Sequence, residues 1–382
     1  MGFALFLLVF LSLYSGLHLY ALLKVRAALT LGTGMYAGIL IFMIIMVLCP
    51  IIVRVLERFG LESMARLMAQ VGYIWMGFLF LFISASLILD ICRLPVLVGG
   101  LVFKTSLSGM ADPFRYAFWG ALILSGAISV YGYFAALDIQ TTRLTLESPK
   151  IPAEIGKLRI AQISDVHLGL IVGERRLKRI LAKVEAAEPD ILVSTGDLVD
   201  GQPDNITNLA ELFRNTRAKY GAFAVTGNHE YYAGLKRSLD FTQKAGFKLL
   251  RGEGVTVAGL INIAGVDDPT GNRVGLGGAL SEKALLSRMP QDKFTLFLKH
   301  RPSIDEEAVA FFDLQLSGHV HKGQIFPFSL VTRLVHPRNA GLYQVARNAY
   351  LYVSRGSGTW GPPIRFLASP EVAIIELVHE GN

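Results

Sequence analysis

The sequence predicts a four-helix transmembrane domain over residues 1–137, followed by an α/β domain. Three observations lead to this fold class. Apolar residues make up 52% of the 382-residue chain and the mean hydropathy is +0.45, which is high for a water-soluble globule of this size. Residues 1–137 hold only 8 Lys/Arg and 4 Asp/Glu, whereas the rest of the chain holds 29 and 26. Beyond residue 157 short apolar runs of strand length alternate with helical or turn segments.

Membrane spans are predicted wherever the first domain lacks charge. A helix needs about 20 apolar residues to cross about 30 Å of hydrocarbon, and helices satisfy their own backbone groups in lipid. Stretches long enough and free of Asp, Glu, Lys and Arg are Met1–Leu23, Ala27–Val53, Leu67–Leu89 and Tyr116–Leu137.

Two segments of this domain need separate interpretation. Met1–Leu23 lacks a basic leading region and exceeds the apolar length of a signal peptide, so we expect a retained helix. His18 within it is expected near a helix end or at a helix contact. Leu94–Phe103 is too short to span and contains Pro95, so it is predicted to be re-entrant or interfacial.

Four spans place the N-terminus and the α/β domain on the same side of the membrane. Basic loop residues number six on that side and five on the other, which does not decide the orientation. The first helix has no basic residue before it, and Lys24 and Arg26 follow it. This favours an extracytoplasmic position for the α/β domain.

Residues 138–156 are predicted to be a polar linker that ends near Pro149 and Pro152, and residues 157–382 are predicted to be the α/β domain. Helices are expected over Leu177–Ala187 and Pro302–Phe312. The basic residues around the first of these form either a solvated face or a surface for anionic headgroups. The expected strands are Leu158–Ser164, Asp190–Thr195, Ala222–Thr226, Val255–Ala264, Phe294–Lys299, Leu314–Ser317, Ala349–Ser354 and Val372–Val378.

Charge and cysteine content exclude several classes of protein. The net charge of +7 divides into +4 and +3 between the two parts, so neither has the concentrated basic surface typical of nucleic-acid binding. A chain this apolar is able to bury a core, which excludes disorder. Cys49 and Cys92 lie in apolar surroundings and are expected to be small buried hydrophobes, not a disulfide framework.

Polar residues follow five of the predicted strands directly, and ligands of α/β folds usually bind beyond the carboxyl ends of strands. Carboxylates, imidazoles and an amide oxygen suit manganese, iron or zinc. Glycines 196, 227 and 318 are expected to let the backbone turn sharply beside the cluster. The segments are Asp165-Val166-His167, Gly196-Asp197-Leu198-Val199-Asp200, Gly227-Asn228-His229-Glu230, His300 and Gly318-His319-Val320-His321.

This ordered set resembles the calcineurin-like metallophosphoesterases over roughly residues 157–380. The segments 163–169 and 354–366 are similar to a bacterial membrane-associated subgroup that includes YaeI- and YkuE-type phosphohydrolases and a UDP-2,3-diacylglucosamine pyrophosphatase. The resemblance implies an α/β/β/α sandwich of two mixed sheets and two divalent metals. Lys322 departs from the subgroup, which commonly has glycine there, and this puts the substrate in doubt.

The resemblance also implies roles for individual residues. Asp197 would bridge the two metals. His229 would not bind metal but would face the phosphate, and Asn228 would also contact substrate. The first site would be completed by Asp165, His167 and His321, and the second by Asn228, His300 and His319.

The expected function is a membrane-anchored dimetal phosphoesterase of the bacterial plasma membrane. Its substrate would carry a phosphodiester, pyrophosphate or phosphomonoester on a small molecule or a lipid, with UDP-2,3-diacylglucosamine as one example. That example requires a cytoplasmic domain. The alternative is a non-catalytic membrane sensor or scaffold with a metal-binding domain. Phe326-Pro327-Phe328 lies just beyond the last motif, where it either lines an apolar entrance or packs in the core.

Overall fold

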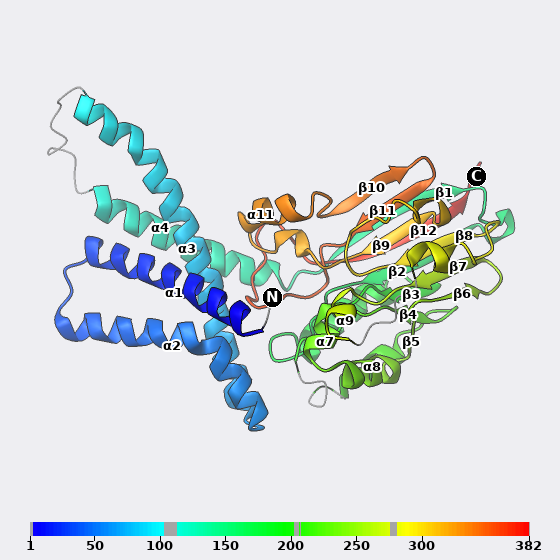
Figure 1. Cartoon of the computed structure of the whole chain (residues 1–382), viewed down its shortest axis with the longest axis horizontal. Coiled ribbons are helices and arrows are strands. Elements are labelled where there is room, and N and C mark those ends of the chain that lie inside the picture. The colour runs from blue at the N-terminus through cyan, green and yellow to red at the C-terminus, as the bar shows by residue number, and fades with distance from the viewer. Residues whose placement is uncertain (1–2, 103–112, 202–205, 207, 276–280, 382) are drawn as a thin grey trace. The chain divides into compact units, whose positions relative to one another are not determined.

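The computed structural model describes residues 3–102, 113–201, 206, 208–275 and 281–381 (Figure 1). These residues form two compact units, of which one contains residues up to 134 together with residues 361–364, and the other contains residues 135–360 and 365–381. Each unit is described by itself.

The first unit consists of four long helices, which confirms the predicted spans. Each contains a stretch that is long and apolar enough to cross a membrane. The helices are α1 (Phe3–Ala28), α2 (Thr33–Arg58), α3 (Glu62–Val102) and α4 (Pro113–Ala135).

Leu94–Phe103 was predicted to be re-entrant or interfacial, and its described part does not form a re-entrant loop. Residues 94–102 continue α3, which is 41 residues long and contains Pro95, and Phe103 lies outside the described residues. A proline removes only one helical hydrogen bond, and helices of membrane proteins tolerate it. The expectation that both cysteines are buried is half right, because Cys49 is buried and Cys92 is exposed.

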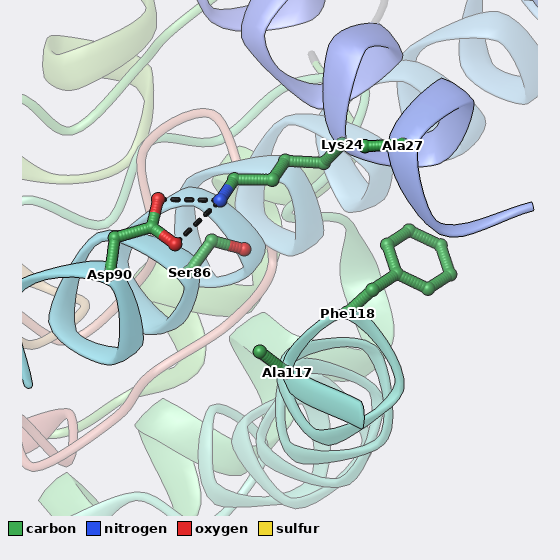
Figure 2. A pocket seen from close by; sticks show the side chains of 6 residues that line it. All are labelled: Lys24, Ala27, Ser86, Asp90, Ala117 and Phe118. Carbon is green, nitrogen blue, oxygen red and sulfur yellow. Dashed lines mark hydrogen bonds and ion pairs between the residues drawn. The ribbon is translucent and has the colours of Figure 1, made fainter. Parts of the chain in front are cut away.

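Two polar contacts join α1 to α3 within the first unit. His18 is buried, where its Nε2 accepts a hydrogen bond from Trp75 Nε1 at 2.9 Å, so it lies at a helix contact as expected. Lys24 Nζ donates to Asp90 Oδ1 at 2.6 Å, and Tyr20 donates to the same carboxylate at 2.9 Å. Figure 2 shows this ion pair beside Ser86, in a small pocket that α4 also lines through Ala117 and Phe118.

The second unit is built on two six-stranded mixed sheets. The first has the strand order β1-β12-β2-β3-β4-β5 and the second has the order β10-β11-β9-β8-β7-β6. Neighbours are parallel except at β12–β2, β10–β11 and β6–β7. The strands are β1 (Gln140–Ser148), β2 (Lys157–Ile163), β3 (Ile191–Ser194), β4 (Ala222–Ala224), β5 (Phe247–Leu249), β6 (Glu253–Val257), β7 (Ile261–Gly265), β8 (Phe294–Leu298), β9 (Leu314–Ser317), β10 (Gly341–Ala346), β11 (Ala349–Val353) and β12 (Glu371–His379).

Successive side chains of each strand point to opposite faces of its sheet, and this alternation produces the sandwich. On β2, Leu158 and Ile160 pack with residues of the second sheet, whereas Ala161 and Ile163 pack against helices on the opposite face. The two sheets therefore bury one common apolar core and carry helices on their outer faces, which confirms the α/β/β/α sandwich. The helices of this unit are α5 (Glu174–Glu185), α6 (Ala210–Asn215), α7 (Asn228–Tyr232), α8 (Leu235–Lys244), α9 (Thr270–Arg273), α10 (Glu282–Leu286) and α11 (Phe328–Val335).

Several predicted elements differ from the structure. The single strand expected over Val255–Ala264 is the hairpin β6–β7, which turns at Ala258 and Gly259, both with positive φ. The helix expected over Pro302–Phe312 is limited to one 3₁₀ turn at Val309–Phe311. Strands β5 and β10 were not predicted.

The stretch 138–156 is not simply a linker. Within it, β1 pairs in parallel with β12 along its whole length, from Gln140 opposite Glu371 to Ser148 opposite His379. Its alternating polar residues are those of an edge strand with one exposed face. Only four residues separate the end of α4 from the start of β1.

A buried carboxylate links the two sheets at this edge. Glu371 on β12 is 1% exposed and accepts hydrogen bonds from Thr142 on β1 at 2.6 Å and from Tyr352 on β11 at 2.9 Å. Arg355 donates to it from its backbone N–H and from its guanidinium. This one side chain therefore joins β1, β11 and β12.

We expect Glu371→Ala to lower the free energy of unfolding by about 3 kcal/mol, because it leaves Arg355 and Tyr352 without their acceptor. Urea unfolding of the detergent-solubilised full-length protein measures the change. Glu147→Ala, on the exposed face of β1, is the matched control and should shift stability by less than about 0.5 kcal/mol. Equal shifts for the two variants would contradict a structural role for Glu371.

Candidate metal centre

The structure brings together all eight side chains that the sequence singled out. They follow the ends of β2, β3 and β4 in one sheet and of β8 and β9 in the other, so both sheets contribute to a single centre. The residues are Asp165 and His167 after β2, Asp197 after β3, Asn228 and His229 after β4, His300 after β8, and His319 and His321 after β9.

The first group of donor atoms contains Asp165, His167 and His321. His167 Nε2 and His321 Nε2 lie 3.1 Å apart, and His321 Nε2 lies 3.5 Å from Asp165 Oδ1. All three side chains are buried. Two imidazole nitrogens and a carboxylate oxygen thus converge on one point.

The second group contains Asp197, His300 and His319. His300 Nε2 lies 3.2 Å from Asp197 Oδ2 and 3.3 Å from Asn228 Oδ1, and His319 Nδ1 lies 3.2 Å from the same nitrogen. Asp197 Oδ2 is also 3.8 Å from His167 Nε2 in the first group. Asp197 therefore lies between the two groups.

Five of these residues have a left-handed backbone, which side chains other than glycine rarely adopt. The φ values are +52° at Asp165, +54° at His167, +52° at Asp197, +74° at His319 and +47° at His321. Such a conformation costs on the order of 1–2 kcal/mol per residue. Lys322 continues the pattern at +52°, which accounts physically for a glycine at this position in the subgroup that the sequence resembles.

The neighbouring glycines act in a different way from the one expected. Of Gly196, Gly227 and Gly318, only Gly196 has a positive φ, of +95°. A Cβ on Gly227 would lie 2.1 Å from Asp197 Oδ1, and a Cβ on Gly318 would lie 2.2 Å from Asp165 Oδ2. These two glycines leave room for carboxylates and do not provide a special turn.

The buried carboxylates and imidazoles shift one another's pKa values. Burial raises the pKa of the Asp197 carboxyl, but the charges of His300, His229 and His167, together with the hydrogen bond to His300, hold that pKa well below its usual range. Burial lowers the pKa of His300, but the charge of Asp197 and its hydrogen bond, with the charges of Asp165 and Asp268, together raise the pKa to about 10. Burial, followed by the charge of His300, lowers the pKa of His319 to about 3. A cation bound here would take over from the His300 proton as the counter-charge of Asp197.

His229 lies at the outer side of the centre. Its Nδ1 is 2.7 Å from Asp200 Oδ1, and its ring contacts those of Tyr232 and Trp360, which are 65% and 54% exposed. Burial lowers the pKa of His229, but the charges of Asp197 and Asp200 raise it to about 9. Asp200 closes the Gly-Asp-x-x-Asp segment and was not among the residues that we predicted to act in the site.

Two further residues that support the centre were missed. The buried Glu230 carboxylate accepts hydrogen bonds from the backbone N–H groups of Asp197, Leu198 and Gly227, so it ties the loop after β3 to the start of α7. Its position three residues after Gly227, at the start of a helix, was an available signal.

The other missed residue is Arg365, which is fully buried. Its guanidinium donates to the carbonyl groups of Arg355, Gly358 and His321, and its Nη2 lies 3.0 Å from His321 Nδ1. Arg365 therefore fixes the backbone and the ring of His321 from behind.

The donor set fits divalent metal ions. It offers these two groups of imidazole and carboxylate atoms and a third, overlapping group of His167, Asp197 and His229, and its oxygen and nitrogen ligands are those of manganese, iron and zinc. Two of the ligand rings are also held on their other side: His300 Nδ1 lies 2.8 Å from the Thr195 carbonyl oxygen, and His321 Nδ1 lies 3.0 Å from Arg365 Nη2. This is the outer-shell support that metal-binding histidines usually have.

Comparisons with known proteins agree with this geometry. Residues 158–323 match the family model described as calcineurin-like phosphoesterase. An uncharacterized metallophosphoesterase of Aquifex aeolicus is 38% identical over 262 residues, which is 68% of this chain and 100% of that protein. The uncharacterized metallophosphoesterase YkuE of Bacillus subtilis is 32% identical over 68% of this chain and 92% of its own length.

A relative in Danio rerio, named transmembrane protein with metallophosphoesterase domain, is 30% identical over 67% of this chain and 62% of its own length. This likeness joins the four apolar helices in indicating a membrane protein. Together with the two groups of metal donors, these similarities establish that the chain belongs to the calcineurin-like metallophosphoesterase family of metal-dependent phosphohydrolases.

Proposed function

We propose that this protein is a membrane-anchored two-metal phosphohydrolase whose substrate is a phosphate ester or pyrophosphate carried by a lipid. The observation that supports two metals is the position of Asp197 between two groups of donor atoms, in which every side chain except the half-buried His319 is buried. A single ion would leave one group of buried imidazoles and carboxylates without a cation, which is costly in a protein interior.

In this proposal Asp197 would serve both ions. Asp165, His167 and His321 would hold the first ion, and Asn228, His300 and His319 would hold the second. Manganese, iron and zinc all suit the donor set. When bound, the ions supply Lewis-acid activation of water and stabilise the charge that develops on the phosphoryl group.

His229 acts on the leaving group. Asp200 holds its Nδ1 at 2.7 Å, so Nε2 is the ring nitrogen that faces a substrate oxygen. We propose that Nε2 donates a proton to the leaving oxygen, with the Asp200 carboxylate fixing the ring and stabilising its charge. The Asn228 side-chain amide borders the same position and orients the phosphate.

The lipid character of the substrate is supported by the surroundings of His229. Tyr232 and Trp360 contact its ring and expose more than half of their surface, so the approach to the phosphate position is aromatic. Membrane anchoring also raises the local concentration of lipid substrates. Lys322, next to His321, adds a positive charge for an anionic headgroup.

We further propose that the protein resides in a bacterial plasma membrane with its catalytic domain on the extracytoplasmic side. Proteolysis of intact spheroplasts tests this orientation, because an external domain is degraded before lysis. Protection until lysis would reverse the orientation and would admit UDP-2,3-diacylglucosamine as a substrate, since that lipid requires a cytoplasmic domain.

Hydrolysis of bis-p-nitrophenyl phosphate by the detergent-solubilised full-length protein, with manganese, iron or zinc added, tests the activity directly. Phosphate-bearing lipids then serve as the second set of substrates. Two metals bound per chain without hydrolysis of any phosphate ester would favour the non-catalytic sensor over the enzyme.

Asp197→Asn should abolish turnover and remove both metals, because the proposed bridge loses its charge. Inductively coupled plasma mass spectrometry measures metal per chain, and the phosphodiester assay measures turnover. Asp292→Asn, at an exposed position, is the matched control and should retain both. Loss of only one metal in Asp197→Asn would refute the bridging role.

His229→Asn should retain two metals but lower kcat by about 10²–10³-fold, the effect of removing a proton donor or transition-state contact. The comparison of kcat with metal content separates this role from metal binding. Full activity in the variant would show that the leaving oxygen takes its proton from another group.

Gly318→Ala should reduce metal content and turnover together, because the new Cβ would lie 1.9 Å from Ser164 Oγ and 2.2 Å from Asp165 Oδ2. The control is Gly259→Ala, where φ is +72° and no atom lies within 4 Å of the new Cβ. It tests backbone conformation without crowding and should keep both metals. Normal metal content in Gly318→Ala would contradict the assigned crowding.

A further inference from the structure

Helix α11 exposes several large apolar side chains on the surface of the catalytic unit. None of the residues of α11 is buried. Leu334 and Val335 are 85% and 69% exposed, and Leu330 and Val331 expose about half of their surface. These positions are three and four residues apart, so they share one face of the helix. A contiguous apolar face of this kind marks an interaction surface.

The chain around this helix carries only positive charge. Residues 314–370 contain no Asp or Glu. The basic residues Arg333 on α11 and Arg338 just beyond it are exposed. An apolar face flanked by exposed arginines has the composition of a helix that lies in the interface of an anionic membrane.

The helix is fixed to the metal centre. It begins seven residues after His321, and the backbone of Ser329 packs so closely on Gly323 that a Cβ there would lie 2.4 Å away. At its other end the ring of His336 contacts the ring of His319, with centroids 5.5 Å apart. A surface that binds α11 therefore also lies close to the metal centre.

A bilayer is within reach of the catalytic unit in every molecule. The same chain carries four membrane-spanning helices, and only four residues connect α4 to β1. At most about 3.6 Å per residue, this connection extends to roughly 15–20 Å. The catalytic unit is thus tethered at the surface of a membrane.

We propose that α11 inserts its apolar face into the interfacial layer of the membrane in which the protein is anchored, with Arg333 and Arg338 on anionic headgroups. The metal centre is then held at the level of lipid phosphates. That consequence for the substrate rests on the proposed function, whereas the insertion itself does not.

The test uses the full-length protein in nanodiscs made of equal parts phosphatidylcholine and phosphatidylglycerol. An environment-sensitive nitrobenzoxadiazole dye is attached at Leu334→Cys in a Cys92→Ser background, because Cys92 is exposed and Cys49 is buried. The same dye at Glu188→Cys, where the side chain is 86% exposed, is the control. Lipids with doxyl groups quench only dye that contacts the bilayer, whereas iodide quenches dye in water.

We expect blue-shifted emission and loss of most of the signal to doxyl lipid at position 334, and iodide quenching at position 188. Iodide quenching at 334 equal to that at 188 would overturn the proposal. Protection of 334 from both quenchers would overturn it as well, since the helix would then be covered by protein, either the chain's own helices or a second copy.

A second variant guards against an effect of the dye alone. Val335→Glu places a charge on the apolar face and should remove the doxyl quenching at 334. Val274→Glu, at a residue that is 52% exposed on another element, should leave it unchanged. Unchanged quenching in Val335→Glu would also overturn the insertion. Because none of these measurements requires turnover, a protein that hydrolyses no phosphate ester would still give a clear result.

Discussion

The catalytic unit depends on the contacts that the Asp197 carboxylate makes with both sheets. One oxygen accepts the backbone N–H of His229 at 2.8 Å, and the other lies 3.2 Å from His300 Nε2. His229 follows a strand of the first sheet and His300 follows a strand of the second, so this one group connects the ends of both sheets. Its burial is tolerated because each of its oxygens has a partner.

Much of the site was accessible from the sequence because its chemistry is local. Asp197 and His300 each follow a strongly apolar strand, Asp165 follows a strand of mixed polarity, and their order along the chain is a property of the sequence itself. The supporting residues were harder to find. Arg365 lies 44 residues from His321, and no local pattern distinguishes a buried arginine from a surface one. The left-handed backbone of five site residues could not be predicted either, because residues other than glycine rarely adopt it and their sequence does not indicate it.

The elements of the fold likewise divide into those that could be predicted from the sequence and those that could not. The four spans and the central strands follow from hydropathy, whereas the edge strands β1, β5 and β10 are short or polar on one face and resemble loops. The β6–β7 hairpin was read as one strand because Ala258 occupies a turn position where asparagine or glycine is usual. The polar stretch after α4 looked like a linker because an edge strand needs apolar residues on only one face.

The pairing of β1 with β12 has a consequence for how the protein is made. Thr142 and Glu371 are 229 residues apart. The first strand of the chain therefore cannot pair until the last strand has been synthesised. At about 5–20 residues per second the wait is roughly 10–45 s. Closing a loop of that length costs about 5 kcal/mol of chain entropy. During this interval the four helices already hold the waiting strand at the membrane, which shortens the search that the last strand must make.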